Sequence, residues 1–181
     1  MKMRRVIAIL IVILTAGGVA AAQDEYTMAV QANPWGFLAG AYGANFEVLL
    51  LPSHGLMAEG ALTIAEGQRS IGGGVHYRFH PAGELGSFFV GPFAKVFNSA
   101  GVVTENNVEY DFSALALVFG ANLGRRWIWD PGISLVLRGG YGYTILNTSY
   151  DGVRPANEGL VDLLLRFALG FDLELSIGWA Y

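Results

Sequence analysis

The chain has no cysteine, few charged residues and, after its first 22 positions, no long hydrophobic run. Without cysteine it can form no disulfide framework and no lipidated-cysteine anchor. Charged residues make up 14% of the 181 and apolar residues 53%, whereas ordinary globular chains have about 25% charged residues. A membrane helix needs about 20 consecutive apolar residues. An apolar chain without such a span predicts a closed β-barrel whose outer surface faces lipid.

The first 22 residues have the layout of a secretory signal peptide. A basic start at Lys2, Arg4 and Arg5 is followed by an apolar run over residues 6–14 and by three alanines at 20–22. The apolar run is too short to span a bilayer. We therefore predict a cleaved signal peptide over 1–22 and one domain over 23–181. That domain has eight Lys and Arg against 15 Asp and Glu, a net charge of −7, which argues against nucleic acid as a partner.

The last eleven residues show the pattern on which the fold prediction rests. Apolar residues occupy every second position, and acidic or small residues lie between them. Side chains of a β-strand alternate between its two faces, so this is a strand with one apolar and one polar face. The apolar positions are Phe171, Leu173, Leu175, Ile177, Trp179 and Tyr181.

The same alternation recurs along the rest of the chain. It predicts strands over residues 27–39, 42–50, 56–64, 71–79, 88–96, 109–127 and 133–145, in addition to the closing strand. Residues 160–169 do not alternate, and Asp162 and Arg166 are spaced as on a helix. We take this segment as an extension of the last strand, although a short helix would also fit. The predicted fold class is all-β: an eight-stranded antiparallel up-and-down transmembrane β-barrel.

Connection lengths and aromatic residues favour a membrane barrel over a soluble β fold. Tight, proline-containing turns are expected after the second, fourth and sixth strands, and long polar loops over 98–107 and 147–159. Aromatic residues gather at both interfaces of membrane barrels. Those expected at the short-turn rim are Tyr77, Phe79, Trp127, Trp129, Trp179 and Tyr181, and those toward the other rim are Trp35, Tyr42, Tyr110, Phe112 and Tyr143. A soluble periplasmic barrel of lipocalin shape, with its apolar face inward, is the alternative.

The polar faces of these strands supply the candidate site residues. They form a predicted polar network in the lumen: Glu47, Glu59, His76, Arg78, Arg138, Asp172 and Glu174, joined by Asn45, Lys95 and Asn122. An eight-stranded barrel is just wide enough for side chains to fill, and buried charges must be paired. Glu47 and Glu59 lie symmetrically about Ser53, which predicts that they oppose each other and share a cation from Arg78 or Arg138. A structural plug of salt bridges is the simpler interpretation, and a gate is the alternative.

No catalytic, cofactor or metal site is predicted. His76 and His80 share a face, but about 13 Å of extended strand separates them, too far to bind one metal ion. The chain has no G-x-S-x-G motif. Ser87 and His80 flank one turn, a spacing too unspecific to indicate a lipid-hydrolysing pair. The inward glycines precede no helix and so form no phosphate loop; they give a narrow barrel room for larger side chains.

Three short segments carry a resemblance to a known family: Asn33 to Leu38 (NPWGFL), Phe89 to Phe93 (FVGPF) and Gly124 to Trp127 (GRRW). They resemble a poorly characterised family of small bacterial outer-membrane β-barrels of unassigned function, similar in shape to OmpX-like and OmpW-like barrels. The C-terminal alternation resembles the signal that the bacterial barrel-assembly machinery reads. The resemblance implies the bacterial outer membrane and brings no catalytic residues.

These observations lead to one functional hypothesis and two alternatives. The first is an integral outer-membrane barrel with a structural or surface-interaction role, monomeric and without enzymatic activity or cofactor. Its partners would be outer-membrane lipid and, during biogenesis, the barrel-assembly machinery. The second is a narrow channel for small or apolar solutes. The third is the soluble lipocalin-like binding barrel.

Overall fold

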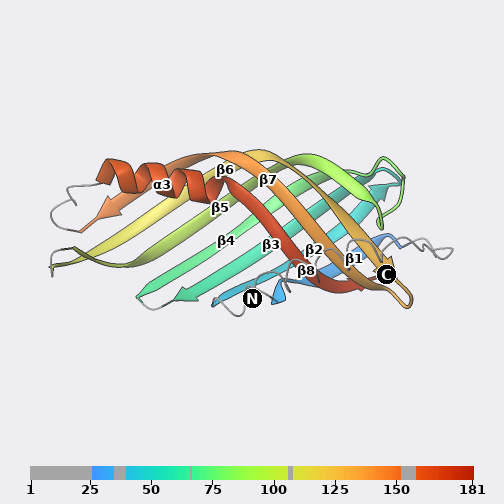
Figure 1. Ribbon diagram of the computed structural model, residues 1–181, viewed down its shortest axis with the longest axis horizontal. Helices are drawn as coiled ribbons and strands as arrows, with labels where there is room; N and C mark the ends of the chain where they lie inside the picture. The colour runs from blue at the N-terminus through green and yellow to red at the C-terminus, as the bar shows by residue number, and fades with distance from the viewer. Residues whose placement is uncertain (1–25, 35–39, 66, 106–107, 152–157) are drawn as a thin grey trace, which may run out of the picture.

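The computed structural model describes residues 26–34, 40–65, 67–105, 108–151 and 158–181 and shows a closed antiparallel β-barrel (Figure 1). Each strand pairs with its neighbours in sequence, and β1 pairs with β8 to close the ring. The elements are β1 Met28–Ala32, β2 Ala41–Leu51, β3 His54–Ala65, β4 Gln68–Phe79, β5 Phe88–Glu105, β6 Val108–Trp129, β7 Ile133–Tyr150, α3 Glu158–Gly170 and β8 Phe171–Ala180. The predicted eight-stranded up-and-down topology is confirmed. The predicted signal peptide lies outside the described residues.

The barrel is apolar outside and polar inside. Phe46, Leu123 and Leu173 point outward and are exposed, whereas Glu47 and Arg78 on the same sheet are fully buried. This is the reverse of a soluble barrel, which keeps its apolar face out of water. The described strands therefore do not fit the lipocalin-like alternative.

At the end of the barrel away from the short turns, the strands β5 and β7 extend further than predicted. β5 continues to Glu105 and β6 begins at Val108, so most of the predicted loop over 98–107 is a β-hairpin. β7 likewise continues to Tyr150, into the predicted loop over 147–159. Polar residues such as Ser99 take part in strand pairing as well as apolar residues do. Ser99 is paired with Ser70, and its hydroxyl donates to Ser70 Oγ at 2.9 Å. Loss of the apolar face therefore does not mark where a strand ends.

The segment before β8 is a helix, and its interpretation as an extension of the last strand is wrong. α3 runs alongside β7 at the end of the barrel away from the short turns (Figure 1) and leads directly into β8 at Phe171. The helical spacing of Asp162 and Arg166 was the correct signal. Within the described residues, no helix is long and apolar enough to cross a membrane.

The short-turn end also differs in detail from the prediction. The turns after β2 and β6 are tight, and Gly132 closes the second with a φ of 114° that favours glycine. The connection after β4 is longer and runs from His80 to Ser87. Of the predicted aromatic rim, Tyr77, Phe79, Trp129, Trp179 and Tyr181 are exposed, but Trp127 is buried, with the Arg125 guanidinium 5.3 Å from its ring.

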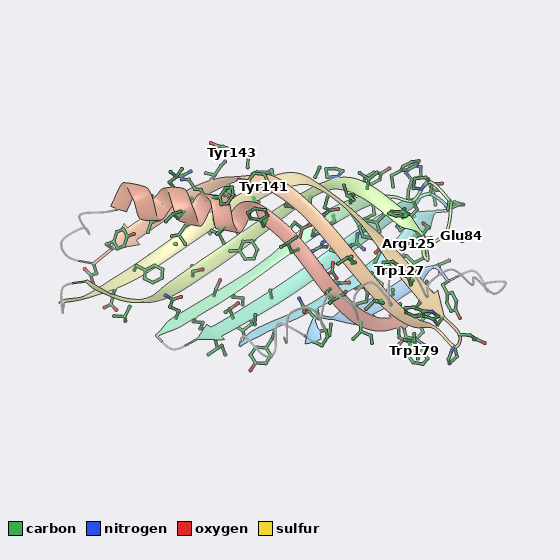
Figure 2. All side chains as sticks on the ribbon, viewed as in Figure 1. Glu84, Arg125, Trp127, Tyr141, Tyr143 and Trp179 are labelled. Atoms are coloured by element: carbon green, nitrogen blue, oxygen red, sulfur yellow. The ribbon has the colours of Figure 1, made fainter. Side chains whose placement is uncertain are left out.

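The first strand and the second aromatic rim are only partly described. β1 ends at Ala32, well short of the predicted residue 39, and residues 35–39 lie outside the described part of the chain, as does Trp35. Tyr42 and Tyr143 are exposed, whereas Phe112 is partly buried and the Tyr110 side chain is not described. Figure 2 shows Tyr141 and Tyr143 near α3, with Trp127 and Trp179 at the opposite end.

Inward glycines make room for the large side chains of β5. Phe93 on β5 is paired with Gly120 on β6, and Gly120 is paired with Gly142 on β7. Phe89 on β5 is likewise paired with a glycine of β6, Gly124. A Cβ atom on Gly120 would lie 2.7 Å from Phe93 Cζ and 2.3 Å from the Tyr141 carbonyl oxygen. The space is therefore already filled by the ring and the neighbouring strand.

Gly120→Leu should destabilise the folded barrel by about 1–3 kcal/mol or more, because overpacking forces the Phe93 ring and the β7 backbone apart. The measurement is a denaturant titration of the protein folded in lipid or detergent. Ala121→Leu is the matched control, since Ala121 is the next residue on the same strand and points outward. Equal stability of the two variants would contradict the packing role of Gly120.

Candidate functional site

Arg138 on β7 is the centre of a buried network of ion pairs in the barrel interior. Its guanidinium contacts three carboxylates: Glu59 on β3 at 2.8 Å, Asp172 on β8 at 2.8 Å and Glu174 on β8 at 3.0 Å. Arg138 is buried, and so are Asp172 and Glu174. A guanidinium presents several donors in a fixed plane, which suits it to hold carboxylates from different strands. The side chain thus links the wall of the barrel across its interior.

A second group of contacts surrounds Glu47, toward the short turns. Its carboxylate contacts Arg78, Arg126 at 2.7 Å and His80 at 2.9 Å. The Arg78 guanidinium also lies 3.6 Å from Glu174 and 4.0 Å from the centre of the Phe89 ring. Through Glu174, this group is continuous with the contacts of Arg138.

The third group of contacts lies on the other side of Arg138. Lys95 contacts Asp172 at 2.5 Å and Glu59 at 2.8 Å. The Asn122 amide donates to Asp172 at 2.6 Å and lies 2.9 Å from His76 Nδ1. His76 Nε2 in turn faces Glu59 at 3.2 Å. Because an amide nitrogen donates only, His76 Nδ1 accepts, and the ring proton is assigned to Nε2, toward Glu59.

In the described interior, four carboxylates are matched by four cations. These are Glu47, Glu59, Asp172 and Glu174 on one side and Arg78, Lys95, Arg126 and Arg138 on the other. Removing an ion from water costs several kcal/mol unless partners replace its hydration. This matching lets a largely apolar chain keep eight charged side chains inside a narrow barrel.

An apolar cluster covers the network on its short-turn side. The connection after β4 turns Leu85 inward, where it packs with Ala29 and Ala180, and with the partly buried Leu49 and Ile128. Leu85 is fully buried. Side chains from the turn region therefore close this end of the barrel beneath Glu47.

The structure places all seven predicted network residues in the interior. It corrects one pairing: Glu47 lies opposite Met57 and Glu59 opposite Asn45. Leu51 pairs with His54, so the turn is centred between Pro52 and Ser53, and the register shifts by one more residue between Leu49 and Leu51. Symmetry about Ser53 therefore does not hold. The two carboxylates are consequently not direct neighbours, and each has its own arginine, Arg78 for Glu47 and Arg138 for Glu59.

Sequence reasoning missed several members of the network. Arg126 is fully buried and binds both Glu47 and Gln31 Oε1, the latter at 3.1 Å, and Gln31 donates to Ser134 Oγ at 3.2 Å. The alternation of β6 contained the signal, because Arg126 shares the face of Asn122. Gln31 and Ser134 are polar residues near strand ends, and the sequence pattern did not indicate which residues they would contact.

Ser87, His80 and Glu47 form a hydrogen-bonded line near the short turns. Ser87 Oγ lies 3.2 Å from His80 Nδ1, and His80 Nε2 lies 2.9 Å from Glu47 Oε1. The order resembles a hydrolytic triad. However, the Ser87 hydroxyl donates to the Glu84 carbonyl oxygen at 2.5 Å, and Glu47 is already held by two arginines. These hydrogen bonds fit a structural role, in which Glu47 and His80 hold the β4–β5 connection in place at the short-turn end.

A cavity of about 160 Å³ adjoins the network. Its lining includes Asn45, Glu59, Lys95, Phe97, Arg138 and Glu174. The four charged groups among these already contact one another or Asp172. The cavity therefore suits a few water molecules that hydrate existing ion pairs, and it offers a ligand no unmatched charge among them.

The closing strand has the two faces that its alternation predicts. Phe171, Leu173, Ile177, Trp179 and Tyr181 are exposed and Leu175 is partly so, whereas Asp172, Glu174 and Ser176 are buried. Tyr181 also completes the seam with β1: its amide donates to Met28 O at 2.8 Å, and its carbonyl accepts from Thr27 and Met28 at 2.8 and 3.1 Å. The last residue thus contributes both an outward ring and backbone hydrogen bonds.

No protein-family model and no curated protein matches the chain. Among solved structures, it is similar to two crystal structures from Acinetobacter baumannii. The match to CarO2 has a TM-score of 0.43 at 9% identity and covers 86% of this chain and 98% of that one. The match to CarO has a TM-score of 0.43 at 10% identity and covers 88% and 100%. Likeness at this level carries no argument about function, and the OmpX-like or OmpW-like resemblance stays a prediction.

Arg138→Gln should lower the stability of the folded barrel by about 3–5 kcal/mol, because three buried carboxylates lose a shared cation. The measurements are denaturant unfolding in lipid and ion flux through vesicles. Arg69→Gln, at an exposed position on β4, is the control and should change stability by less than about 0.5 kcal/mol. Loss of stability without new flux supports a structural plug, whereas new flux at unchanged stability supports a gate.

Proposed function

We propose that the protein is an integral barrel of the bacterial outer membrane, with a structural or surface-interaction role and no enzymatic activity. The observation that carries this proposal is the inversion of the barrel. Large apolar side chains cover its outside, while four carboxylates and four cationic side chains are paired inside. In lipid, a closed barrel satisfies every backbone hydrogen bond and an apolar exterior costs nothing.

The filled interior favours a structural role over a channel. Arg78, Arg126 and Phe89 are among its largest fully buried side chains, and the Leu85 cluster covers them at the short-turn end. A conducting path would have to displace these groups and expose unpaired charges. The narrow channel remains the second candidate, and ion flux distinguishes the two.

The two ends of the barrel support an orientation. Outer-membrane barrels place their short turns in the periplasm and their longer connections outside the cell. The longest connection, residues 151–170 between β7 and β8, includes α3 and lies at the end where β5, β6 and β7 extend, although β3–β4 and β5–β6 are joined there by short turns. By this rule, that end faces the exterior and supplies a surface for interaction. Closure of the sheet leaves few free strand edges for self-association, which supports a monomer. Outer-membrane lipid is then the constant partner.

The last strand is proposed to carry the signal for the barrel-assembly machinery. The proposal rests on the outward row Phe171, Leu173, Leu175, Ile177, Trp179 and Tyr181, which contains three aromatic rings. The strand forms one side of the closing seam with β1. Because β8 closes the barrel, its edge stays accessible until closure. The barrel-assembly machinery could therefore bind it during assembly.

Expressed with its first 22 residues in a diderm bacterium, the protein should be found in the outer-membrane fraction. The folded barrel should also migrate differently on a gel before and after boiling, because its sheet resists detergent until heated. Vesicles containing it should show no ion flux above that of empty vesicles. Recovery from the soluble periplasm would overturn the proposal, and clear solute flux would favour the channel.

Tyr181→Ala should reduce the amount of folded protein in the outer membrane while leaving export and signal cleavage unchanged. This substitution removes the outward ring but keeps the backbone hydrogen bonds to Thr27 and Met28. The measurement compares heat-shifted and unshifted bands in fractionated cells. Tyr181→Phe, which keeps an aromatic ring at this position, is the control. Normal assembly of the alanine variant would remove the signalling role of the ring.

A further inference from the structure

Helix α3 lies where the sheet of the barrel is incomplete. β7 pairs with β6 as far as Tyr150, but its pairing with β8 stops at Tyr141, opposite Phe171. Beyond Tyr141, no strand among the described residues continues the β8 side of β7. In lipid, an open edge of this kind would leave backbone carbonyls without partners, at a cost of several kcal/mol for each.

Side chains of the helix hydrogen-bond to this edge, and one of them satisfies two of its backbone carbonyls. Arg166 donates from Nη1 to Thr144 O at 3.2 Å and from Nη2 to Leu146 O at 2.9 Å. One helical turn earlier, Asp162 accepts from Thr148 Oγ1 at 3.1 Å. Helix and strand run in opposite directions here, so successive turns of α3 meet successive residues of the edge. The two charged side chains are thereby directed toward β7.

The end of the helix fits closely against the same strand. A Cβ atom on Gly170 would lie 2.7 Å from the Gly142 carbonyl oxygen and 2.9 Å from the Tyr141 ring. β8 begins at the next residue, Phe171. Helix and strand therefore form one continuous element that accompanies β7 along its length.

The remaining side chains divide α3 into two apolar sides. Leu165 and Leu169 pack against the inward residues Ala114, Ala116 and Leu146. Leu163, Leu164 and Phe167 are 63%, 59% and 56% exposed on the outer side. The Phe167 ring meets the outward rings of Tyr141 and Phe171 with centroids 6.0 and 5.1 Å away. The exposed side is thus continuous with the outer surface of β7 and β8 (Figure 2).

We propose that α3 is part of the membrane-facing wall of the barrel and that Leu163, Leu164 and Phe167 contact lipid on the outer-leaflet side. This inference rests on the proposed function, because it needs the barrel to lie in a membrane. Three exposed apolar side chains would be unfavourable in water, and a helix lying on a membrane surface would carry charges on its free side. Of the charged residues of α3 whose side chains the structure describes, Asp162 and Arg166 both contact β7 instead.

Spin labels at single cysteines test the contact with lipid, since the native chain contains no cysteine. The variants are Leu163→Cys, Leu164→Cys and Phe167→Cys, each labelled with a nitroxide and reconstituted into phospholipid vesicles. Collision with oxygen, which concentrates in lipid, is compared with collision with a water-soluble nickel chelate. The oxygen-to-nickel ratio should be severalfold higher at these positions than at Asp151→Cys, an exposed polar position just after β7.

Two further positions separate failure of the inference from failure of the proposed function. Leu123→Cys, on the exposed outer face of β6, reports whether the barrel lies in lipid at all. Leu165→Cys, on the inward side of α3, should be less accessible to oxygen than Leu164→Cys. A high ratio at residue 123 with a low ratio at 163, 164 and 167 would overturn the wall assignment and leave a water-exposed docking face. A low ratio at residue 123 would overturn the membrane barrel itself.

Discussion

The need to pair every buried charge constrains this barrel more than any other feature. An eight-stranded barrel has an interior that side chains just fill, and here that interior contains charged residues from seven of the eight strands, β2 to β8. Arg138 pairs three of the four interior carboxylates at once, because its guanidinium contacts Glu59, Asp172 and Glu174. The inward glycines, the order of the strands and the closed short-turn end all serve a core of this composition. Some of its ion pairs, such as Arg138 with Glu59 and Arg126 with Glu47, join strands on different sides of the barrel and so depend on the closed ring.

The exterior follows from the same arrangement. Alternation along a strand sends the neighbours of each inward charge outward, and those neighbours are almost all apolar. A barrel of this kind has its polar core inside and its apolar surface outside, so it is suited to lipid rather than to water. Function at the surface would then come from the ends of the barrel, where β5, β6 and β7 extend and α3 covers the strand edge.

α3 illustrates a second constraint, the satisfaction of backbone groups at the edge of a sheet. β8 ends its pairing at Phe171 while β7 continues, and a helix of two apolar sides takes the place of the missing strand. Arg166 supplies through its guanidinium what a strand would supply through its amides. A non-alternating segment between two strands can thus belong to the wall of a barrel rather than to a loop.

The sequence by itself determined the strand number, the up-and-down order and which side chains face inward, because a period of two residues is a local property that needs no knowledge of the fold. It also indicated the candidate network, from Glu47 to Glu174. Only the tertiary structure decided the partners. The pairing of Leu51 with His54 and the register shift between Leu49 and Leu51 placed Glu47 opposite Met57 rather than Glu59. Arg126 joined Glu47 from a strand 79 residues away. Closure of the ring sets such distances, and no local pattern records them. The same holds for α3, whose helical spacing was visible but whose role depends on the open edge of β7.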